Sequence, residues 1–184
     1  MEQKTIVIWG AGKIGRGFVA DLFSAAGYGI VLVDASSTLV AQLREAGRYT
    51  IVRAESPERR QDVVIEGYTA LSTAQADELT EAIGATDILA LAVFPQHFGQ
   101  AAQQLATGIA YRKAKRPNAP LDILLCTNLA HAGPRFWALL KEALPADAQA
   151  HMESSVGVVE TLVIRMAAEP PAELRQREPL LVWT

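Results

Sequence analysis

Residues 5–17 read TIVIWGAGKIGRG, an apolar run followed by four glycines in close succession. The apolar and β-branched residues from Thr5 to Trp9 predict a short strand. Apolar side chains recur at helical spacing between Ile14 and Ala26, which predicts a helix directly after the glycines. Glycine gives up side-chain packing and costs conformational entropy, so this strand-to-helix turn must need a bare backbone.

The same alternation continues beyond this turn. Gly27 suits the left-handed end of the first helix, and Gly29 to Val33 predict a second, continuously apolar strand that ends on Asp34. Ser36 or Ser37 can cap a helix over residues 39–46, and Gly47 marks its end. The chain therefore begins as a β-α-β-α unit.

The middle of the chain interrupts the alternation. Residues 49–54 and 62–66 predict two strands around the polar turn ESPERR, which is a β-hairpin inserted into the α/β pattern. Residues 73–83 predict a polar helix. Strands are then expected over 87–93, 121–126 and 156–166, with helices from Gln96 to about Lys115 and up to about Leu144. This order predicts an α/β fold of the Rossmann type, with a doubly wound, mostly parallel sheet.

The glycines have a functional explanation in such a fold. GAGKIG matches G-x-G-x-x-G in the required strand-to-helix context, which predicts a dinucleotide site. Gly10 would make the tight turn, Gly12 would let the backbone approach a pyrophosphate, and Gly15 would let the helix pack closely on the strand. The pyrophosphate would lie at the positive end of the helix that starts at Ile14. The candidate cofactor-binding residues of this turn are Gly10, Ala11, Gly12, Lys13, Ile14 and Gly15.

Asp34 makes the prediction more specific. It follows the second strand at the place where a carboxylate accepts hydrogen bonds from the adenosine ribose. A carboxylate there repels the 2′-phosphate of NADP, and the following residues ASSTL contain no arginine to bind one. The sequence therefore predicts NAD rather than NADP. The alternative is structural: the glycines serve packing alone and Asp34 serves only as a helix cap.

Other candidates follow the later strands. Val93 ends the strand DILALAV, Phe94 and Pro95 follow it, and all three are expected near the cofactor. Asn128, after the next strand, could hydrogen-bond the nicotinamide half or a reacting oxygen. His97 and His131 lie near the same edge, where each is either a proton carrier or an exposed or helix-capping side chain. No metal-ligand spacing is present, so we expect no metal.

Composition limits the remaining possibilities. The 184 residues are half hydrophobic and carry a net charge of -3, which predicts one globular domain over residues 1–184 and argues against a nucleic-acid groove or an anionic membrane as partner. No apolar stretch has the length of a membrane span and the N-terminus lacks a signal peptide, so a cytoplasmic location is expected. The single cysteine, Cys126, predicts a buried thiol. The basic run YRKAKRP is either an anion-binding patch or a set of cations that offset a helix dipole.

The stretch VIWGAGKIGRGFVADLFSAAGYGIVLVD resembles the mannitol dehydrogenase family of polyol-specific long-chain dehydrogenases, most closely its mannitol-1-phosphate 5-dehydrogenases. LAVFPQHF, LLCTNLAHAG and VGVVETLVIRM extend the resemblance over most of the chain. It implies an N-terminal Rossmann domain that holds NAD and a helical C-terminal domain that carries a catalytic lysine. The implied reaction is reversible hydride transfer between NAD and a secondary alcohol of a sugar alcohol or its phosphate.

The chain departs from the family pattern at two places. Thr127 stands where the family commonly has an acidic residue before the asparagine, and Ile164 precedes Arg165 where the family has Asp-Arg. The chain also ends on the apolar run PLLVWT, which is either a docked final strand or the interior of a longer protein, with the helical catalytic domain absent.

Two functions therefore stay open. One is the NAD-binding part of a polyol or polyol-phosphate dehydrogenase, inactive by itself. The other is a stand-alone NAD-sensing or interaction module without catalysis. A third and weaker possibility is an NADP- or FAD-binding domain, which Asp34 and the family resemblance respectively disfavour. The oligomeric state and the roles of Arg16, His97, His131 and Arg165 are not predicted by the sequence.

Overall fold

A parallel sheet of six strands forms the centre of the protein, whose computed structural model describes residues 3–56 and 59–184. The strand order is β5-β2-β1-β6-β7-β8, and every neighbouring pair is parallel. The order runs outward from β1 in both directions, as in a doubly wound Rossmann fold. The strands are β1 (Thr5–Trp9), β2 (Gly29–Asp34), β5 (Thr69–Ser72), β6 (Ile88–Leu91), β7 (Leu121–Leu125) and β8 (Val156–Glu160).

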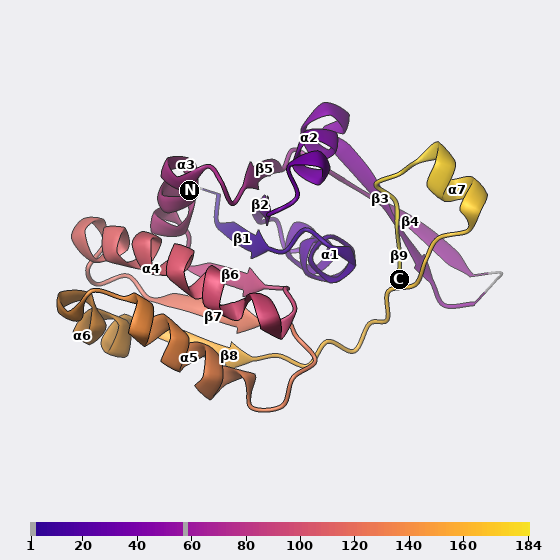
Figure 1. Cartoon of the computed structure of the whole chain (residues 1–184). Coiled ribbons are helices and arrows are strands. Elements are labelled where there is room, and N and C mark those ends of the chain that lie inside the picture. The colour runs from indigo at the N-terminus through magenta and orange to yellow at the C-terminus, as the bar shows by residue number, and fades with distance from the viewer. Residues whose placement is uncertain (1–2, 57–58) are drawn as a thin grey trace.

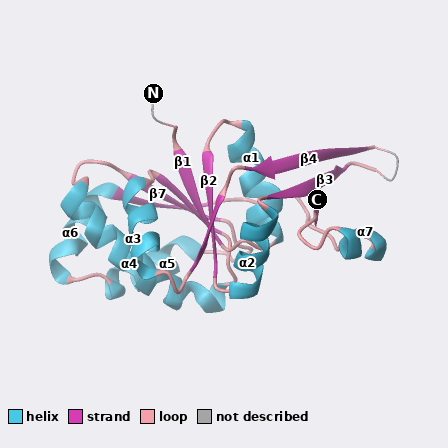
Figure 2. Ribbon diagram, turned by 90° about the horizontal axis from the view of Figure 1, so that it is seen from above, coloured by secondary structure: helices cyan, strands magenta, loops and turns pink. Residues whose placement is uncertain are grey.

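Helices cover both faces of this sheet (Figures 1 and 2). Val7 and Trp9 of β1 are buried in one apolar cluster, and Ile6 and Ile8 in another, because successive side chains of a strand point to opposite faces. Burial on both faces explains the continuous apolar strands in the sequence. The first cluster includes side chains of α3 (Ala76–Ala85), α4 (Phe98–Lys115), α5 (Ala132–Ala143) and α6 (Ala146–Ser155); the second includes those of α1 (Ala20–Ala25) and α2 (Ser37–Ala46).

The predicted hairpin is present, but it builds a sheet of its own. β3 (Arg48–Ala54) and β4 (Arg60–Glu66) pair antiparallel, and their expected turn includes residues 57–58, which lie outside the described residues. β9 (Val182–Trp183) pairs parallel with β3, so the final apolar run docks as a strand. The six-stranded sheet is thus entirely parallel, and the inserted antiparallel hairpin lies beside it in a second sheet (Figure 1).

One buried carboxylate ties this second sheet to the Rossmann core. Asp21 in α1 is 1% exposed and accepts hydrogen bonds from Arg53 of β3, at 2.5 and 2.9 Å, and from Arg165 of the segment after β8. Burial by itself would raise the pKa of the Asp21 carboxyl, but the hydrogen bonds from Arg53 and Arg165 outweigh it and lower the pKa. Three segments far apart in the sequence therefore meet at one ion-paired group.

Several elements differ from the expected ones. The strand expected over residues 156–166 ends at Glu160, because β7 ends at Leu125 and offers no further ladder partner. The helix expected from Thr73 begins at Ala76, and the short edge strand β5 before it was not predicted. A 3-10 turn, η2 (Pro95–His97), precedes α4, and a π-helical turn, η1 (Gly15–Val19), precedes α1. The polar helices α6 and α7 (Ala172–Arg177) were also not predicted.

Beyond β8 the chain is extended with an apolar outer side. Leu162, Ile164 and Met166 are 80 to 87% exposed, while the alternating Thr161, Val163 and Arg165 are half-buried. Contiguous exposed apolar side chains mark surfaces that pack against another body. The apolar character of this stretch, which favoured a buried strand in the sequence, therefore belongs to the surface.

The basic run at the end of α4 has a structural role. Arg112 is fully buried and donates to the backbone carbonyls of Gly84, at 3.0 Å, and Pro120, at 2.5 Å, and to the Asp87 carboxylate at 2.7 Å. Arg116 pairs with the same carboxylate at 2.9 Å. These cations join α4 to the loops before β6 and β7, so this run is not an open anion-binding patch. Among the helices of the described residues, none combines the length and apolarity that a bilayer crossing requires.

Asp21→Ala should destabilise the protein by about 2 to 3 kcal/mol, because it leaves Arg53 and Arg165 without their shared carboxylate. Asp62→Ala is the control, since Asp62 is exposed on β4. Urea unfolding measures the free energy of unfolding of both variants.

The stability that Asp21 contributes should also depend on pH, because its folded-state pKa lies below its ordinary value of 3.8. Its contribution is therefore complete above about pH 5 and is lost as the pH falls through the folded pKa, so the difference between wild type and Asp21→Ala should shrink in acid. A difference that stays constant down to pH 2 would contradict this role.

Candidate functional site

In the glycine-rich turn between β1 and η1, the packing around each glycine agrees with the role expected for it. Gly10 has a φ of +100°, and a Cβ there would overlap the Ala92 carbonyl. A Cβ on Gly15 would overlap the Gly10 carbonyl oxygen and lie 3.1 Å from Cγ2 of Ile8. Gly12 differs, since a Cβ there would meet nothing within 4 Å. Gly10 and Gly15 therefore close the turn, while Gly12 leaves open space above it.

Asp34 holds this turn from the neighbouring strand. Its Oδ2 accepts a hydrogen bond from the backbone N–H of Ala11 at 2.9 Å, and its Oδ1 accepts one from the N–H of Ser36 at 2.9 Å. Ser36 caps α2 through its own side chain, which accepts from the N–H of Leu39. Asp34 is thus not the side-chain cap of α2. Each carboxylate oxygen keeps one lone pair, so both can accept a further hydrogen bond from a ligand.

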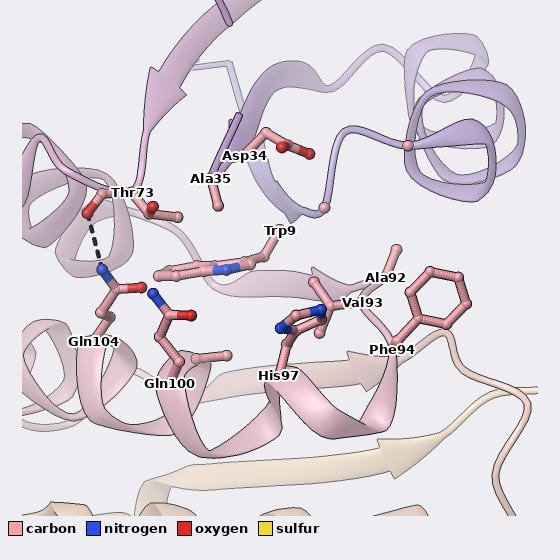
Figure 3. A pocket seen from close by; sticks show the side chains of 13 residues that line it. Trp9, Asp34, Ala35, Thr73, Ala92, Val93, Phe94, His97, Gln100 and Gln104 are labelled. Atoms are coloured by element: carbon pink, nitrogen blue, oxygen red, sulfur yellow. Dashed lines mark hydrogen bonds between the residues drawn. The ribbon is translucent and has the colours of Figure 1, made fainter. Parts of the chain in front are cut away.

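A cavity of about 290 Å³ opens beside the turn, along the carboxyl ends of β1, β2, β5 and β6 (Figure 3). Its volume is near the lower end of the range for small-molecule sites and suits part of a dinucleotide. Apolar groups from Trp9, Ala35 and Ala101 make up much of its wall. The lining residues are Trp9, Gly10, Gly12, Asp34, Ala35, Thr73, Ala92, Val93, Phe94, His97, Gln100, Ala101 and Gln104.

The predicted residues divide between this cavity and its supports. Gly10, Gly12, Asp34, Val93 and Phe94 line it, and Phe94 is 71% exposed at its edge. Of the two candidate histidines, His97 lines the cavity. His131 is exposed on another loop, where its backbone is left-handed and its side chain caps no helix.

The other residues of the turn support it from outside the cavity. Ala11 is buried behind it, and Ile14 packs in the apolar cluster beneath α1. No side chain caps the first turn of the helix there. The N–H of Arg16 donates to the carbonyl of Gly12 at 2.9 Å. The N–H groups that precede it in the turn need an acceptor from outside the helix, and an anion is a suitable one. Pro95 begins η2, next to the cavity.

Two basic side chains near the turn are bound to the C-terminal segment. Lys13 pairs with Glu169. Arg16 is buried, and it donates to the carbonyls of Ala11, at 2.7 Å, and Leu180, at 2.6 Å. Burial lowers the pKa of the Arg16 guanidinium. Arg16 therefore braces the turn from below, because it ties the Ala11 carbonyl to the segment that leads into β9.

Asn128 lies at the same edge of the sheet but outside the cavity. The loop that carries it begins at Cys126, whose N–H donates to the carbonyl of Leu91 at the end of β6, at 2.9 Å. Asn128 itself is exposed. On the next strand, Glu160 accepts a hydrogen bond from the N–H of Gly133 at 2.8 Å and so anchors the start of α5. The loop is thus fixed at both ends, with Asn128 facing outward between them.

Sequence reasoning missed the far end of the cavity. Thr73 follows β5, the strand that was not predicted. Gln100 and Gln104 lie four residues apart near the start of α4, so their side chains share one face. That spacing was visible in the sequence, but only the crossing of α4 over the sheet edge turns this face toward the cavity.

Cys126 is buried, as predicted, and burial raises the pKa of its thiol. A thiol of this kind is mostly protonated at neutral pH and a poor nucleophile. Among the side chains of residues 3–56 and 59–184, no group of three histidines, cysteines or acids comes together as a metal site would require.

Residues 4–184 match the family model described as the mannitol dehydrogenase Rossmann domain. The chain is also similar to Pseudomonas fluorescens mannitol 2-dehydrogenase, solved as a ternary complex with NAD and D-mannitol, at 16% identity and a TM-score of 0.76, over 95% of this chain and 44% of that one. Yersinopine dehydrogenase is similar in its apo form, at 17% identity and a TM-score of 0.68, and in its NADP+-bound form, at 18% and 0.66. Each match with yersinopine dehydrogenase covers 99% of this chain and 38% of that one.

The chain therefore spans less than half the length of these solved structures. At such identities the likeness shows the shared fold. One of these structures holds NAD and another NADP+, so the fold alone does not select between the two cofactors.

Gly15→Ala should lower the free energy of unfolding by about 1 to 3 kcal/mol, because its methyl group would overlap the Gly10 carbonyl. Gly12→Ala should change it by less than about 0.5 kcal/mol, since its methyl group enters open space. Chemical denaturation of the two variants makes the comparison. Equal losses of stability in both would contradict the division between closing glycines and an open one.

Proposed function

Because the chain belongs to the mannitol dehydrogenase family, we propose that it is the NAD(H)-binding domain of an oxidoreductase that acts on a sugar alcohol or sugar-alcohol phosphate. The observation that carries this proposal is the joint position of Gly12 and Asp34 on one cavity. Gly10 and Gly15 are tightly packed against the neighbouring backbone, whereas the space beside Gly12 is open. A pyrophosphate needs that open space, and an adenosine ribose needs the carboxylate beside it.

The residues of the turn fit a dinucleotide in three ways. Gly12 lines the cavity, no side chain caps the helix start at η1, and Asp34 keeps acceptor capacity after its bonds to Ala11 and Ser36. We propose that Gly10, Ala11, Gly12, Lys13, Ile14 and Gly15 hold the pyrophosphate, directly or through the turn's shape, while Asp34 binds the ribose. Val93, Phe94 and Pro95 extend the site from β6 toward the neighbouring strand end.

NAD is the proposed cofactor in preference to NADP. The Asp34 carboxylate would lie against a 2′-phosphate, and the exposed residues that follow it, Ala35 to Thr38, bring no positive charge to offset the repulsion. The only anion that the site then receives is the pyrophosphate, which lies at the helix end.

When bound, NAD supplies the hydride acceptor. The chain's own part is to hold the cofactor against the sheet edge and to present Asn128 on the adjacent loop, where its amide could hydrogen-bond the reacting oxygen. Asn128 lies one strand from the cavity, on a loop joined to β6 through the Cys126 N–H. Arg165 is bound to Asp21 and the Gly17 carbonyl, so it positions the C-terminal segment and does not face a substrate.

We further propose that a helical catalytic domain, with the lysine that the family resemblance implies, completes the site in the whole protein, and that this protein is cytoplasmic. The exposed row Leu162, Ile164 and Met166 supports such a domain, because another body must cover it to remove its apolar surface from water. A polyol or its phosphate would bind between the two domains. No observation favours the stand-alone sensor.

NADH binding should be visible through Trp9, which lines the cavity. In a Trp137→Phe, Trp183→Phe double variant Trp9 is the sole tryptophan, so NADH should quench its emission or accept its energy. Replacing Gly12 by Val in this background should abolish the signal while circular dichroism stays unchanged, since the added side chain fills the pyrophosphate space. If the Gly12→Val protein bound NADH with full affinity, the glycines would serve packing alone.

Asp34→Ala should cost about 1.5 to 3 kcal/mol of NADH affinity through the lost ribose hydrogen bonds. The same change loosens Ala11 and would weaken any ligand of the turn, so the ratio of NADH to NADPH affinity is the informative quantity. Wild type should bind NADH far more tightly than NADPH, and Asp34→Ala should bring the two affinities close together. If the ratio of NADH to NADPH affinity is the same in wild type and Asp34→Ala, Asp34 only stabilises the turn and does not contact the ribose.

A further inference from the structure

The side-chain amide of Gln104 has a defined orientation at the far end of the cavity. Its Nε2 donates to the carbonyl oxygen of Thr73 at 2.9 Å. Rotation of the amide by a half turn would place its oxygen against that carbonyl, where two acceptors repel. The Oε1 atom is therefore the end left for a ligand, and Figure 3 shows it turned toward Gln100 and the indole of Trp9. Gln104 itself is half-buried.

The cavity leads from the proposed ribose position to this amide. Asp34 lies at one end, and Gln100 and Gln104 on α4 lie at the other (Figure 3). Between them the wall is made by Trp9 and Ala35, flat and apolar in character, which suits the faces of an aromatic base. Resting on the proposed function, this places the base of the dinucleotide against the start of α4.

We propose that Gln104 makes the site selective for adenine, by accepting a hydrogen bond from the exocyclic 6-amino group through Oε1. A glutamine amide can pair with the 6-amino edge of adenine. Hypoxanthine and guanine carry an oxygen at this position, which would face the Gln104 oxygen with no proton between them. Gln100, one turn earlier, is exposed and free to rotate, so it does not impose the same choice.

The bond to Thr73 is what makes this selection possible. A free glutamine offers either end of its amide, and would pair with a 6-amino or a 6-oxo purine after rotation. Since the Thr73 carbonyl holds Nε2, rotation toward a 6-oxo base breaks one hydrogen bond in order to form another. The strand β5, although short, thus determines base selection through the carbonyl at its end.

The test compares NADH with its hypoxanthine analogue, reduced nicotinamide hypoxanthine dinucleotide, which differs at the 6-position of the purine ring system. Wild-type affinity should favour NADH by about fivefold or more, as one hydrogen bond is exchanged for a contact between two acceptors. Gln104→Met keeps the side-chain length and removes the amide, and it should bring the ratio to about one. Gln103→Met is the matched control, because Gln103 is exposed on α4 and lies outside the cavity.

The outcomes separate this inference from the proposed function. Tight NADH binding by wild type with equal affinity for the analogue would overturn base selection and leave the NAD site intact. Absence of NADH binding by the wild type would overturn both. A ratio that falls in Gln103→Met as much as in Gln104→Met would also overturn the role of Gln104. Thermal unfolding of each variant shows whether the fold persists, and equal wild-type affinities for NADH and its analogue would overturn base selection even if Gln104→Met does not fold.

Discussion

The contact between Gly15 and the carbonyl of Gly10 is the constraint on which the rest of the structure depends. Because no Cβ separates them, the helix after β1 lies directly against the end of the strand. Gly17, two residues later, makes a second close contact. A Cβ there would lie 2.5 Å from Cγ1 of Val182, so the same helix also receives β9. The glycine-rich turn thus serves both a ligand site and the packing of the C-terminal strand.

The turn is held in place by charged groups around it rather than by its own side chains. Asp34 binds the Ala11 N–H from above, and the buried Arg16 binds the Ala11 carbonyl from below. The N–H and the carbonyl of Ala11 therefore both have partners within the protein, and Gly12 is the residue of the turn whose backbone is open to the cavity. Asp21 fixes the helix further along by joining Arg53 and Arg165. A preorganised backbone of this kind loses little entropy when a ligand binds.

In the proposed function, the parts of the site that would bind any dinucleotide are distinct from the parts that would select one. The sheet edge and the glycine turn supply the anion site, which any dinucleotide uses. On the proposals made above, the choice between NAD and NADP rests on Asp34 at the end of β2, and the choice of base rests on Gln104 of α4 and the carbonyl that follows β5. Each selection is made by one or two side chains on an otherwise general scaffold, as is common where function varies within a fold.

Much of the fold could be predicted from the sequence because its signals are local. The apolar runs of the first two strands, a serine cap at Ser36 or Ser37 and the left-handed Gly47 depend on residues close together in the chain. The structure confirms both strands, with Ser36 as the cap, and the left-handed Gly47. The turn motif with Asp34 likewise could be recognised from spacing alone. The four-residue strand β5 could not, because a strand so short has too little alternation to stand out and forms only through its pairing with β2.

By itself, then, the sequence determined the α/β class, the order of the main elements and the residues of the turn, since these depend on propensity and periodicity along the chain. Tertiary structure alone decided that Arg165 binds Asp21, that Leu162 faces solvent and that Gln104 lines the cavity. The physical reason is that these positions depend on which surfaces lie opposite one another after packing. Asp21 and Arg165 are more than a hundred residues apart, so their contact depends on how distant segments pack. The position of Gln104 depends on how α4 crosses the edge of the sheet.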